Sequence, residues 1–303
     1  MLDYHRTLLD DETRTNALRE AISRVVRNGD VVADLGAGTG ILSFFACDAG
    51  ARRVFAIERE HLADVVSFLS RHLRHADRVT VLHDVSTNVE LPELANVLIT
   101  ETIGAAGLDE NIIGFVIDAR KRLLREDATI LPRSISLIAT PADIHEQYQR
   151  HVGFWGEAQG GYDFSPLRVF ASNSMLLLHI KAESHLAKPA ELVNVDLTTV
   201  ESTLVDGSAT YVTTRSGTVH GFALWFRAML VDNIVLTNRE KHSPSWSQAF
   251  FPLEEPVKVK PGTTITLDLQ SDDGKSWRWR GNVGDVAFDQ MTVLNRPPCF
   301  KPE

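Results

Sequence analysis

Hydrophobic residues in the first part of the chain alternate between short apolar runs and stretches with helical spacing. Residues 11–27 carry apolar side chains at helical spacing, with acids early and arginines late, as the helix dipole favours. Short apolar runs typical of strands cover residues 31–35, 53–58, 79–83 and 96–100, and further helical stretches cover residues 41–49, 61–75 and 111–125. Strands that alternate with helices predict βαβ units and a parallel sheet.

After Pro132 the pattern changes to short β-rich runs with few helical periods. Turn signals separate these runs, as at Asp206-Gly207 and Asp273-Gly274. The runs cover residues 134–139, 192–198, 219–230, 247–253, 263–269, 276–280 and 286–293. This pattern predicts a mostly antiparallel β-barrel or sandwich.

The segment at about residues 143–178 interrupts the β-pattern and is rich in aromatic residues. Its aromatic residues include Tyr148, Phe154, Trp155, Tyr162, Phe164 and Phe170. We interpret it as an arm inserted into the second domain. The predicted organisation is therefore an α/β domain over residues 1–132 followed by a β-domain over residues 133–303.

The composition is that of an ordinary globular protein and excludes several classes of function. Of the 303 residues, 44% are hydrophobic and 23% are charged. No apolar run approaches the roughly 18 residues that a membrane-spanning helix needs. Cys47 and Cys299 are too few for a disulfide framework or a cysteine-built metal site. The N-terminus has no signal-peptide pattern, so we expect a cytoplasmic protein that does not bind a membrane.

The formal net charge of −9 bears on the partners of the protein. Nucleic-acid binders normally carry a basic stripe, and none stands out here, so we expect no nucleic-acid partner. An acidic surface can serve solubility alone, or it can attract a cationic substrate. Composition leaves both interpretations open.

A glycine-rich turn follows the first predicted strand, where residues 31–40 read VVADLGAGTG. Glycine permits a tight turn and lets a ligand lie against the backbone. Glu58 ends the next strand 22 residues after Gly36, close to the spacing at which an acid meets ribose hydroxyls. The pattern from Asp34 to Gly40 lacks the G-x-x-G ending that places a pyrophosphate at a helix N-terminus. It resembles motif I of class I methyltransferases, whose cofactor S-adenosylmethionine has no phosphate; the alternative is a structural turn in another α/β protein.

Two glutamates follow the fourth predicted strand, Glu101 and Glu110 in the sequence TETIGAAGLDE. They flank a loop at the carboxyl end of a strand, where open α/β sheets bind ligands. Two carboxylates that converge there suit a guanidinium, whose planar fork of donors they can match bidentately.

The sequence resembles the protein arginine N-methyltransferases over most of its length. The resemblance is carried by residues 5–15 (HRTLLDDETRT), 32–58, 100–110 (TETIGAAGLDE) and 118–132 (DARKRLLREDATILP). These segments are similar to the helix before motif I, motif I with the next strand, the double-glutamate loop, and the helix and strand that enter the family's β-barrel. The resemblance implies a Rossmann-like class I methyltransferase domain, a β-barrel domain with an inserted dimerisation arm, and a homodimer.

The resemblance also implies roles for individual residues. Arg14 would pair with the methionine carboxylate of the cofactor, and Glu58 would hold its ribose. The full set of implied cofactor residues is His5, Arg14, Asp34, Gly36, Gly38, Gly40, Glu58, Asp84 and Ser86. Glu101 and Glu110 would grip the substrate guanidinium. Two carboxylates can localise its positive charge away from the attacking nitrogen, and one of them can accept the proton as the new C–N bond forms.

The chain departs from the family at three places, of which two lie outside the double-glutamate loop. The aromatic helix that usually precedes the segment at His5 is expected to be absent. The family's T-H-W loop reads Pro244-Ser245-Trp246 here, so Ser245 and Trp246 are the candidate substrate contacts of this loop. The family's histidine pairs with an aspartate that remains as Asp11, and the nearby histidine at position 242 is an alternative partner.

The loop between the two glutamates carries small residues where family members often have larger ones, at positions 105–107. With the missing aromatic helix, this loop predicts a small acceptor such as free L-arginine or another guanidino metabolite. The alternatives are arginine within a protein or peptide, another nucleophile, and a non-catalytic dimeric scaffold. We expect no metal, because no cluster of histidine and cysteine offers a site.

Overall fold

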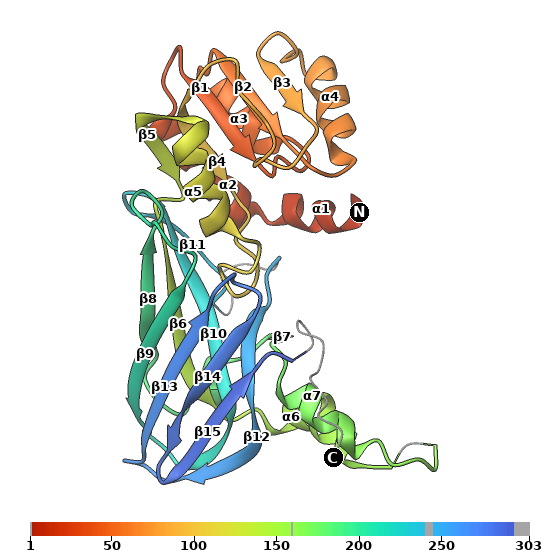
Figure 1. Cartoon of the computed structure of the whole chain (residues 1–303), viewed down its shortest axis with the longest axis vertical. Coiled ribbons are helices and arrows are strands. Elements are labelled where there is room, and N and C mark those ends of the chain that lie inside the picture. Colours follow the sequence, from red (N-terminus) through yellow and green to blue (C-terminus); the bar gives the residue numbers. More distant parts are fainter. Residues whose placement is uncertain (1, 159, 240–244, 294–303) are drawn as a thin grey trace.

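The computed structural model describes residues 2–158, 160–239 and 245–293 (Figure 1). The N-terminal part holds a parallel five-stranded sheet in the order β3-β2-β1-β4-β5. Its strands are β1 (Val31–Leu35), β2 (Arg53–Ile57), β3 (Val79–Leu82), β4 (Ala95–Thr100) and β5 (Leu124–Leu131). Its helices are α1 (Leu2–Asp10), α2 (Glu12–Val25), α3 (Ile41–Asp48), α4 (Leu62–His72) and α5 (Ile112–Arg122).

The central strands of the parallel sheet, β1, β2 and β4, are apolar enough to be covered on both faces. Every residue of β1 is buried, and its register runs from Val31 opposite Arg53 to Leu35 opposite Ile57. The sequence predicted the bounds of β1 as observed. It predicted too long a helix for α5, because β5 begins at Leu124, which pairs with Ala95 of β4. Pairing within the sheet overrides the helical propensity of that leucine and the arginine after it.

The second part of the chain forms two antiparallel sheets, which Figure 1 shows stacked below the α/β part. One has six strands, in the order β7-β12-β10-β6-β8 with β11 paired to β10, and the other has four, in the order β15-β14-β13-β9. Their bounds are β6 (Ser134–Ala142), β7 (Leu176–Leu178), β8 (Ala190–Asp196), β9 (Val205–Val212), β10 (Gly217–Val231), β11 (Ile234–Thr237), β12 (Gln248–Val259), β13 (Thr264–Ser271), β14 (Trp277–Val283) and β15 (Val286–Met291).

Aromatic side chains fill the space between the two antiparallel sheets. The ring of Phe251 lies 5.7 Å from Trp277 and 5.2 Å from Trp279, centroid to centroid, and all three side chains are buried. The indole Nε1 of Trp279 donates to Pro252 O at 3.0 Å, so this buried polar atom is satisfied. The predicted fold class, a Rossmann-like domain followed by a barrel-like antiparallel domain, is confirmed.

The inserted segment forms a helical arm that projects away from the β-domain, at the end far from the parallel sheet (Figure 1). Its helices are α6 (His145–His151) and α7 (Arg168–Ser172), with short 3-10 turns η1 (Gly153–Gly156) and η2 (Ser165–Leu167) between them. Tyr148 anchors the base of the arm, since its buried hydroxyl donates to Leu253 O at 2.8 Å. A further 3-10 turn, η3 (Ala182–Ser184), follows β7.

The β-domain contains strands that the sequence pattern missed, and one of them overturns a predicted turn. Asp206-Gly207 lies inside β9, where Gly207 pairs with Leu269. A Cβ at Gly207 would lie 2.7 Å from the carbonyl oxygen of Leu192 in β8. The glycine is therefore needed where two strands approach closely, not for a turn. The short strands β7 and β11 were also not predicted.

The hydrophobic core runs without a break from the parallel sheet into the β-domain. The loop after β4 lies at the junction, where its residues Ile103, Ala106 and Leu108 are buried in the same cluster as Leu137 and Phe226. No helix among the residues that the structure describes is long and apolar enough to cross a membrane.

Replacing Gly207 with alanine tests the close approach of β8 and β9. We expect a loss of about 1–3 kcal/mol in the free energy of unfolding, because the new methyl group would press on backbone. The measurement is denaturant unfolding followed by tryptophan fluorescence. Gly156→Ala is the matched control, since a Cβ there meets nothing within 4 Å. Equal unfolding midpoints for the two variants would contradict the prediction.

Candidate functional site

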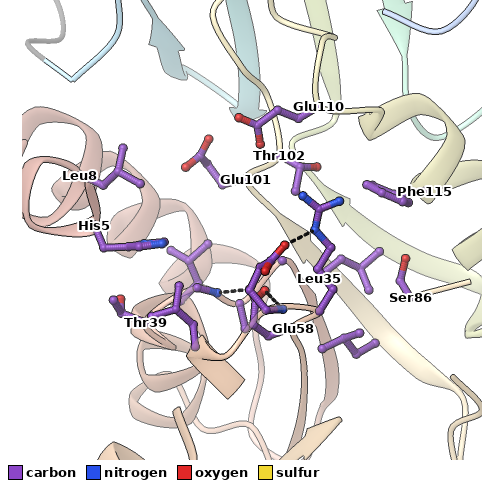
Figure 2. Close-up of a pocket in the computed structure, with 18 of the residues that line it drawn as sticks. His5, Leu8, Leu35, Thr39, Glu58, Ser86, Glu101, Thr102, Glu110 and Phe115 are labelled. Atoms are coloured by element: carbon purple, nitrogen blue, oxygen red, sulfur yellow. Dashed lines mark hydrogen bonds and ion pairs between the residues drawn. The ribbon is translucent and has the colours of Figure 1, made fainter. Parts of the chain in front are cut away.

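A pocket of about 510 Å³ lies where the carboxyl ends of the parallel strands meet α1 and the β-domain. Its wall is built from α1, the glycine loop after β1, the end of β2 and the loop after β4. Figure 2 shows His5 pointing into the pocket from α1, and Glu101 and Glu110 close together at one end. Glu58 lies nearer to the glycine loop (Figure 2).

The glycine loop leaves room for a ligand because glycines have no side chain. Two of these glycines also have a left-handed backbone conformation. Gly36 has φ 73° and Gly38 has φ 55°. A Cβ at Gly36 would lie 2.8 Å from Thr102 Cγ2, and one at Gly38 would lie 3.1 Å from His5 Cε1. Any other residue would fill this cradle or strain the backbone.

Glu58 is fixed by the backbone of the loops around it. Its Oε2 accepts from the amide of Gly38 at 2.8 Å, and its Oε1 accepts from the amide of Glu60 at 2.8 Å. The residue is 6% exposed and lines the pocket. A carboxylate held in this way can accept further hydrogen bonds on its remaining lone pairs, as ribose hydroxyls would require.

Arg14 connects the cofactor end of the pocket to the two glutamates. Its Nη2 donates to Glu101 Oε2 in an ion pair whose side chains are only 6% and 8% exposed. Nη1 donates to Leu8 O at 3.2 Å, and the guanidinium lies 5.5 Å from the centroid of the Trp246 ring. Nε is buried and has no hydrogen-bond partner among the described residues. This orphaned donor suits the carboxylate of a bound S-adenosylmethionine.

Glu110 has a raised pKa. It is exposed and lines the pocket, yet the protein around its carboxyl removes part of its hydration. This loss of hydration, together with repulsion from the carboxylates of Glu101 and Asp109, raises its pKa to about 7, while Arg59 and Arg14 oppose the rise. A carboxyl that titrates near neutrality can take up a proton during a reaction.

Two of the predicted cofactor residues lie outside the pocket, which corrects the expectation of direct contact. Asp34 is fully buried beneath the glycine loop and accepts from Ser43 Oγ at 2.6 Å. Burial raises the pKa of Asp34 to about 7. Gly40 begins α3 with φ 84°, and a Cβ there would lie 2.9 Å from Val66 Cγ1. These residues shape the loop, because both face the core.

The predicted adenine residues line the other end of the pocket. Asp84 accepts from Asn88 Nδ2 at 2.9 Å and from the amide of Val85 at 2.6 Å. The bond from Asn88, followed by that from Val85, lowers the pKa of Asp84. Ser86 is 8% exposed, and its carbonyl accepts from Arg122 Nη2 at 3.0 Å. Asp84 is therefore set by local hydrogen bonds, and Ser86 by a bond from α5.

Ser245, which the resemblance aligns with the family's histidine, contacts Asp11. Its Oγ donates to Asp11 Oδ2 at 2.6 Å, while Asp11 Oδ1 caps α2 by accepting from the amide of Arg14 at 3.0 Å. Ser245 is not among the pocket-lining residues, so we do not expect it to touch the substrate directly, whereas Trp246 lines the pocket. The alternative partner of Asp11, His242, falls outside the described residues.

The structure adds pocket residues that the sequence did not single out. Among them are Tyr4, Arg59, Thr102, Phe115 and Lys275. Thr102 directly follows Glu101, so its place in the chain could have identified it. Lys275 comes from the turn between β13 and β14, and nothing in the local sequence connects that turn with the glutamate loop.

The small residues of the glutamate loop are explained by packing against the β-domain. A Cβ at Gly107, whose φ is 82°, would lie 2.8 Å from Phe226 Cβ and 2.9 Å from Leu137 Cδ2. Ala106 is completely buried. Their size therefore does not enlarge the acceptor pocket, which removes the main sequence argument for a small free substrate.

No group of three or more histidine, cysteine or acidic residues among the described residues could hold a metal ion. The residues that face the pocket instead fit a nucleoside with a charged amino-acid tail. The glycine cradle, the fixed Glu58 and Arg14, whose Nε has no hydrogen-bond partner among the described residues, all line the pocket.

Family models match the two parts of the chain separately. The model of the arginine methyltransferase oligomerization subdomain matches residues 136–284. The model of ribosomal protein L11 methyltransferase matches residues 11–134. The N-terminal match is to a methyltransferase, and the C-terminal match is to arginine methyltransferases in particular.

Similar proteins span nearly the whole chain. Protein arginine N-methyltransferase 6 of Xenopus laevis is 31% identical over 286 residues, which covers 88% of this chain and 83% of the relative. Human protein arginine N-methyltransferase 2 is 28% identical, covering 91% of this chain and 68% of the relative.

Solved structures share the fold at lower identity. The Trypanosoma brucei PRMT1 enzyme-prozyme heterotetrameric complex with AdoHcy superposes with a TM-score of 0.85 at 22% identity, covering 95% of this chain and 96% of that one. Arabidopsis thaliana protein arginine methyltransferase 10 gives a TM-score of 0.80 at 20% identity, covering 96% and 97%. The chain therefore belongs to the protein arginine N-methyltransferase family and is an S-adenosylmethionine-dependent arginine N-methyltransferase.

Proposed function

We propose that the acceptor is an arginine within a protein or peptide, held by Glu101 and Glu110. The observation that carries this proposal is the convergence of the two carboxylates at one end of the pocket (Figure 2). The names of the relatives support a protein substrate. The sequence expectation of free arginine is not supported by the relatives, and one of its two motives, the small residues of the loop, is explained by packing.

We propose that the cofactor is held by the residues that line the pocket from α1 to the end of β3. Glu58 would accept hydrogen bonds from the ribose, and Arg14 Nε would donate to the methionine carboxylate. Bound S-adenosylmethionine supplies an activated methyl group on a sulfonium. The protein then has to align the attacking nitrogen, and such positioning can lower a barrier by roughly 7–11 kcal/mol at best.

The two glutamates would divide the work at the acceptor. Glu101, fixed by Arg14, would orient the guanidinium and draw its positive charge away from the attacking nitrogen. As the new C–N bond forms and the S–C bond breaks, that nitrogen loses a proton. Glu110 Oε would accept it, which suits a carboxyl with a pKa of about 7.

Replacing either glutamate with glutamine tests the guanidine-binding proposal. Each change keeps the shape and removes one charge, so we expect a fall of about 100-fold or more in kcat/KM for an arginine peptide. The measurement is transfer of labelled methyl groups, with mass analysis of the product. Offering free arginine in parallel tests the substrate class, and methylation of free arginine but not of the peptide would overturn the proposal.

Cofactor binding is the control for these variants. Glu110→Gln should bind S-adenosylhomocysteine as the unchanged enzyme does, because Glu110 lies at the acceptor end. Glu58→Gln should weaken that binding, since it removes the charge that faces the ribose. Activity that survives in both Glu101→Gln and Glu110→Gln would show that the acceptor is held elsewhere.

The raised pKa of Glu110 predicts the pH dependence of the enzyme. Below pH 7 the carboxyl is protonated in the free enzyme and cannot pair with a guanidinium, so kcat/KM should fall as the pH decreases through about 7. The profile is measured at low peptide concentration. Glu110→Gln should lose this transition, and a flat profile for the unchanged enzyme between about pH 6 and 8 would contradict the assignment.

We propose that the arm makes the protein a homodimer. The arm exposes large hydrophobic side chains, among them Phe154 at 45%, Tyr162 at 74% and Phe164 at 39%. Apolar side chains gathered on a projecting segment mark a contact surface.

The cytoplasmic location stays a prediction.

Replacing Tyr162 and Phe164 together with serine tests the dimer. We expect the double variant to sediment as a monomer in analytical ultracentrifugation, because the apolar contact is removed. Leu204→Ser is the control, since Leu204 is 57% exposed and lies on the β-domain away from the arm. If the unchanged protein is already monomeric at micromolar concentration, the proposal fails.

A further inference from the structure

The side chain of Asn238 joins three segments that are far apart in the sequence. It follows β11 and is 2% exposed. Its Oδ1 accepts from the amide of Phe226 at 2.9 Å, and its Nδ2 donates to Ala105 O and to Ser247 O, each at 2.8 Å. The buried amide therefore uses both of its donor hydrogens and its acceptor.

Each of the three partners belongs to a wall of the pocket or supports one. Ala105 is in the middle of the loop between Glu101 and Glu110. Ser247 directly follows Trp246, which lines the pocket. Phe226 supports both neighbours, because its ring lies edge-on against Trp246 at 5.1 Å and its Cβ adjoins Gly107.

The glutamate loop needs an anchor from outside itself. Gly104, Ala105, Ala106 and Gly107 form a run of small residues, and glycine gives a chain the largest conformational freedom to lose. Within the loop, Asp109 Oδ1 accepts from the amide of Ala106 at 2.8 Å, which fixes one side. The bond from Asn238 to Ala105 O holds the carbonyl end of the same peptide group to the β-domain.

We propose that Asn238 is a positioning residue for the acceptor, which it serves by holding Ala105 so that Glu101 and Glu110 converge. The inference rests on the proposed role of those glutamates. Asn238 itself does not line the pocket. It acts through the loop. Its bond with Phe226 also keeps the loop aligned with Trp246, whose ring contacts Phe226. Arg14 lies over the same ring, so its position is coupled to the loop as well.

Asn238→Asp is the sharpest variant, because it keeps the shape and the bond from Phe226. It replaces the donor amide with an oxygen that faces two carbonyl oxygens, so the ties to Ala105 and Ser247 are lost. Gln290→Glu is the matched control. Gln290 is also a buried amide, 6% exposed, whose Nε2 donates to Ser172 O at 2.8 Å and whose Oε1 accepts from Glu254 N at 3.1 Å at the base of the arm.

The experiment compares the two full-length variants in melting temperature, binding of S-adenosylhomocysteine, kcat and KM for an arginine peptide, and the pH profile of kcat/KM. For Asn238→Asp we expect kcat/KM to fall on the order of 10-fold to 100-fold, since a small displacement of aligned groups is costly. The midpoint of the pH profile should move away from 7, because the surroundings of Glu110 change. Cofactor binding should remain. Gln290→Glu should lower the melting temperature without either kinetic change.

The inference is overturned if Asn238→Asp loses thermal stability like Gln290→Glu but keeps kcat/KM and the pH midpoint. If Asn238→Asp does not fold, Asn238→Ser is compared with Gln290→Ser, because serine is too short to reach Ala105 and adds no charge. Unchanged kinetics in that pair also overturn it. Full activity in the Glu101 and Glu110 variants would instead overturn the proposed function, so the two failures are distinguishable.

Discussion

The packing of the glutamate loop against the β-domain is the constraint on which the site depends. The loop starts at the carboxyl end of β4 and turns at Gly107, where Phe226 and Leu137 leave no room for a side chain. The β13–β14 turn closes the same junction, since a Cβ at Gly274 would lie 2.0 Å from Leu108 O. The loop can therefore present its glutamates in one arrangement only when both domains are in place.

Electrostatics inside the pocket follow from that arrangement. Removing carboxylates from water is costly unless a cation or hydrogen bonds compensate. Glu101 forms an ion pair with Arg14. Glu110 is repelled by the carboxylate of Glu101, and the attraction from Arg59 and Arg14 is weaker than this repulsion. The two acids thus have different surroundings although they look alike in the sequence. A guanidinium placed between them would compensate both charges, which is the demand that an arginine acceptor satisfies.

The same junction changes how the family departures are understood. The small loop residues fit a tight interface between the domains, so they carry no information about substrate size. Ser245 does not leave Asp11 without a hydrogen bond, because its hydroxyl donates to that carboxylate. The hydrogen bond between the start of α2 and the segment before β12 is kept, and a hydroxyl makes it, which does not titrate near neutral pH. A histidine in its place would titrate there.

The sequence by itself determined the parallel sheet, the glycine loop and the nature of the methyl donor, because these depend on local patterns: an apolar run such as β1, a glycine turn and an acid at a fixed distance. It also identified Glu101 and Glu110 as a pair. Tertiary structure alone decided that Asp34 and Gly40 lie outside the pocket, that Gly207 is in a strand, and that Asn238 holds Ala105. The physical reason is that each of these depends on a contact between segments distant in the chain, which no local periodicity records.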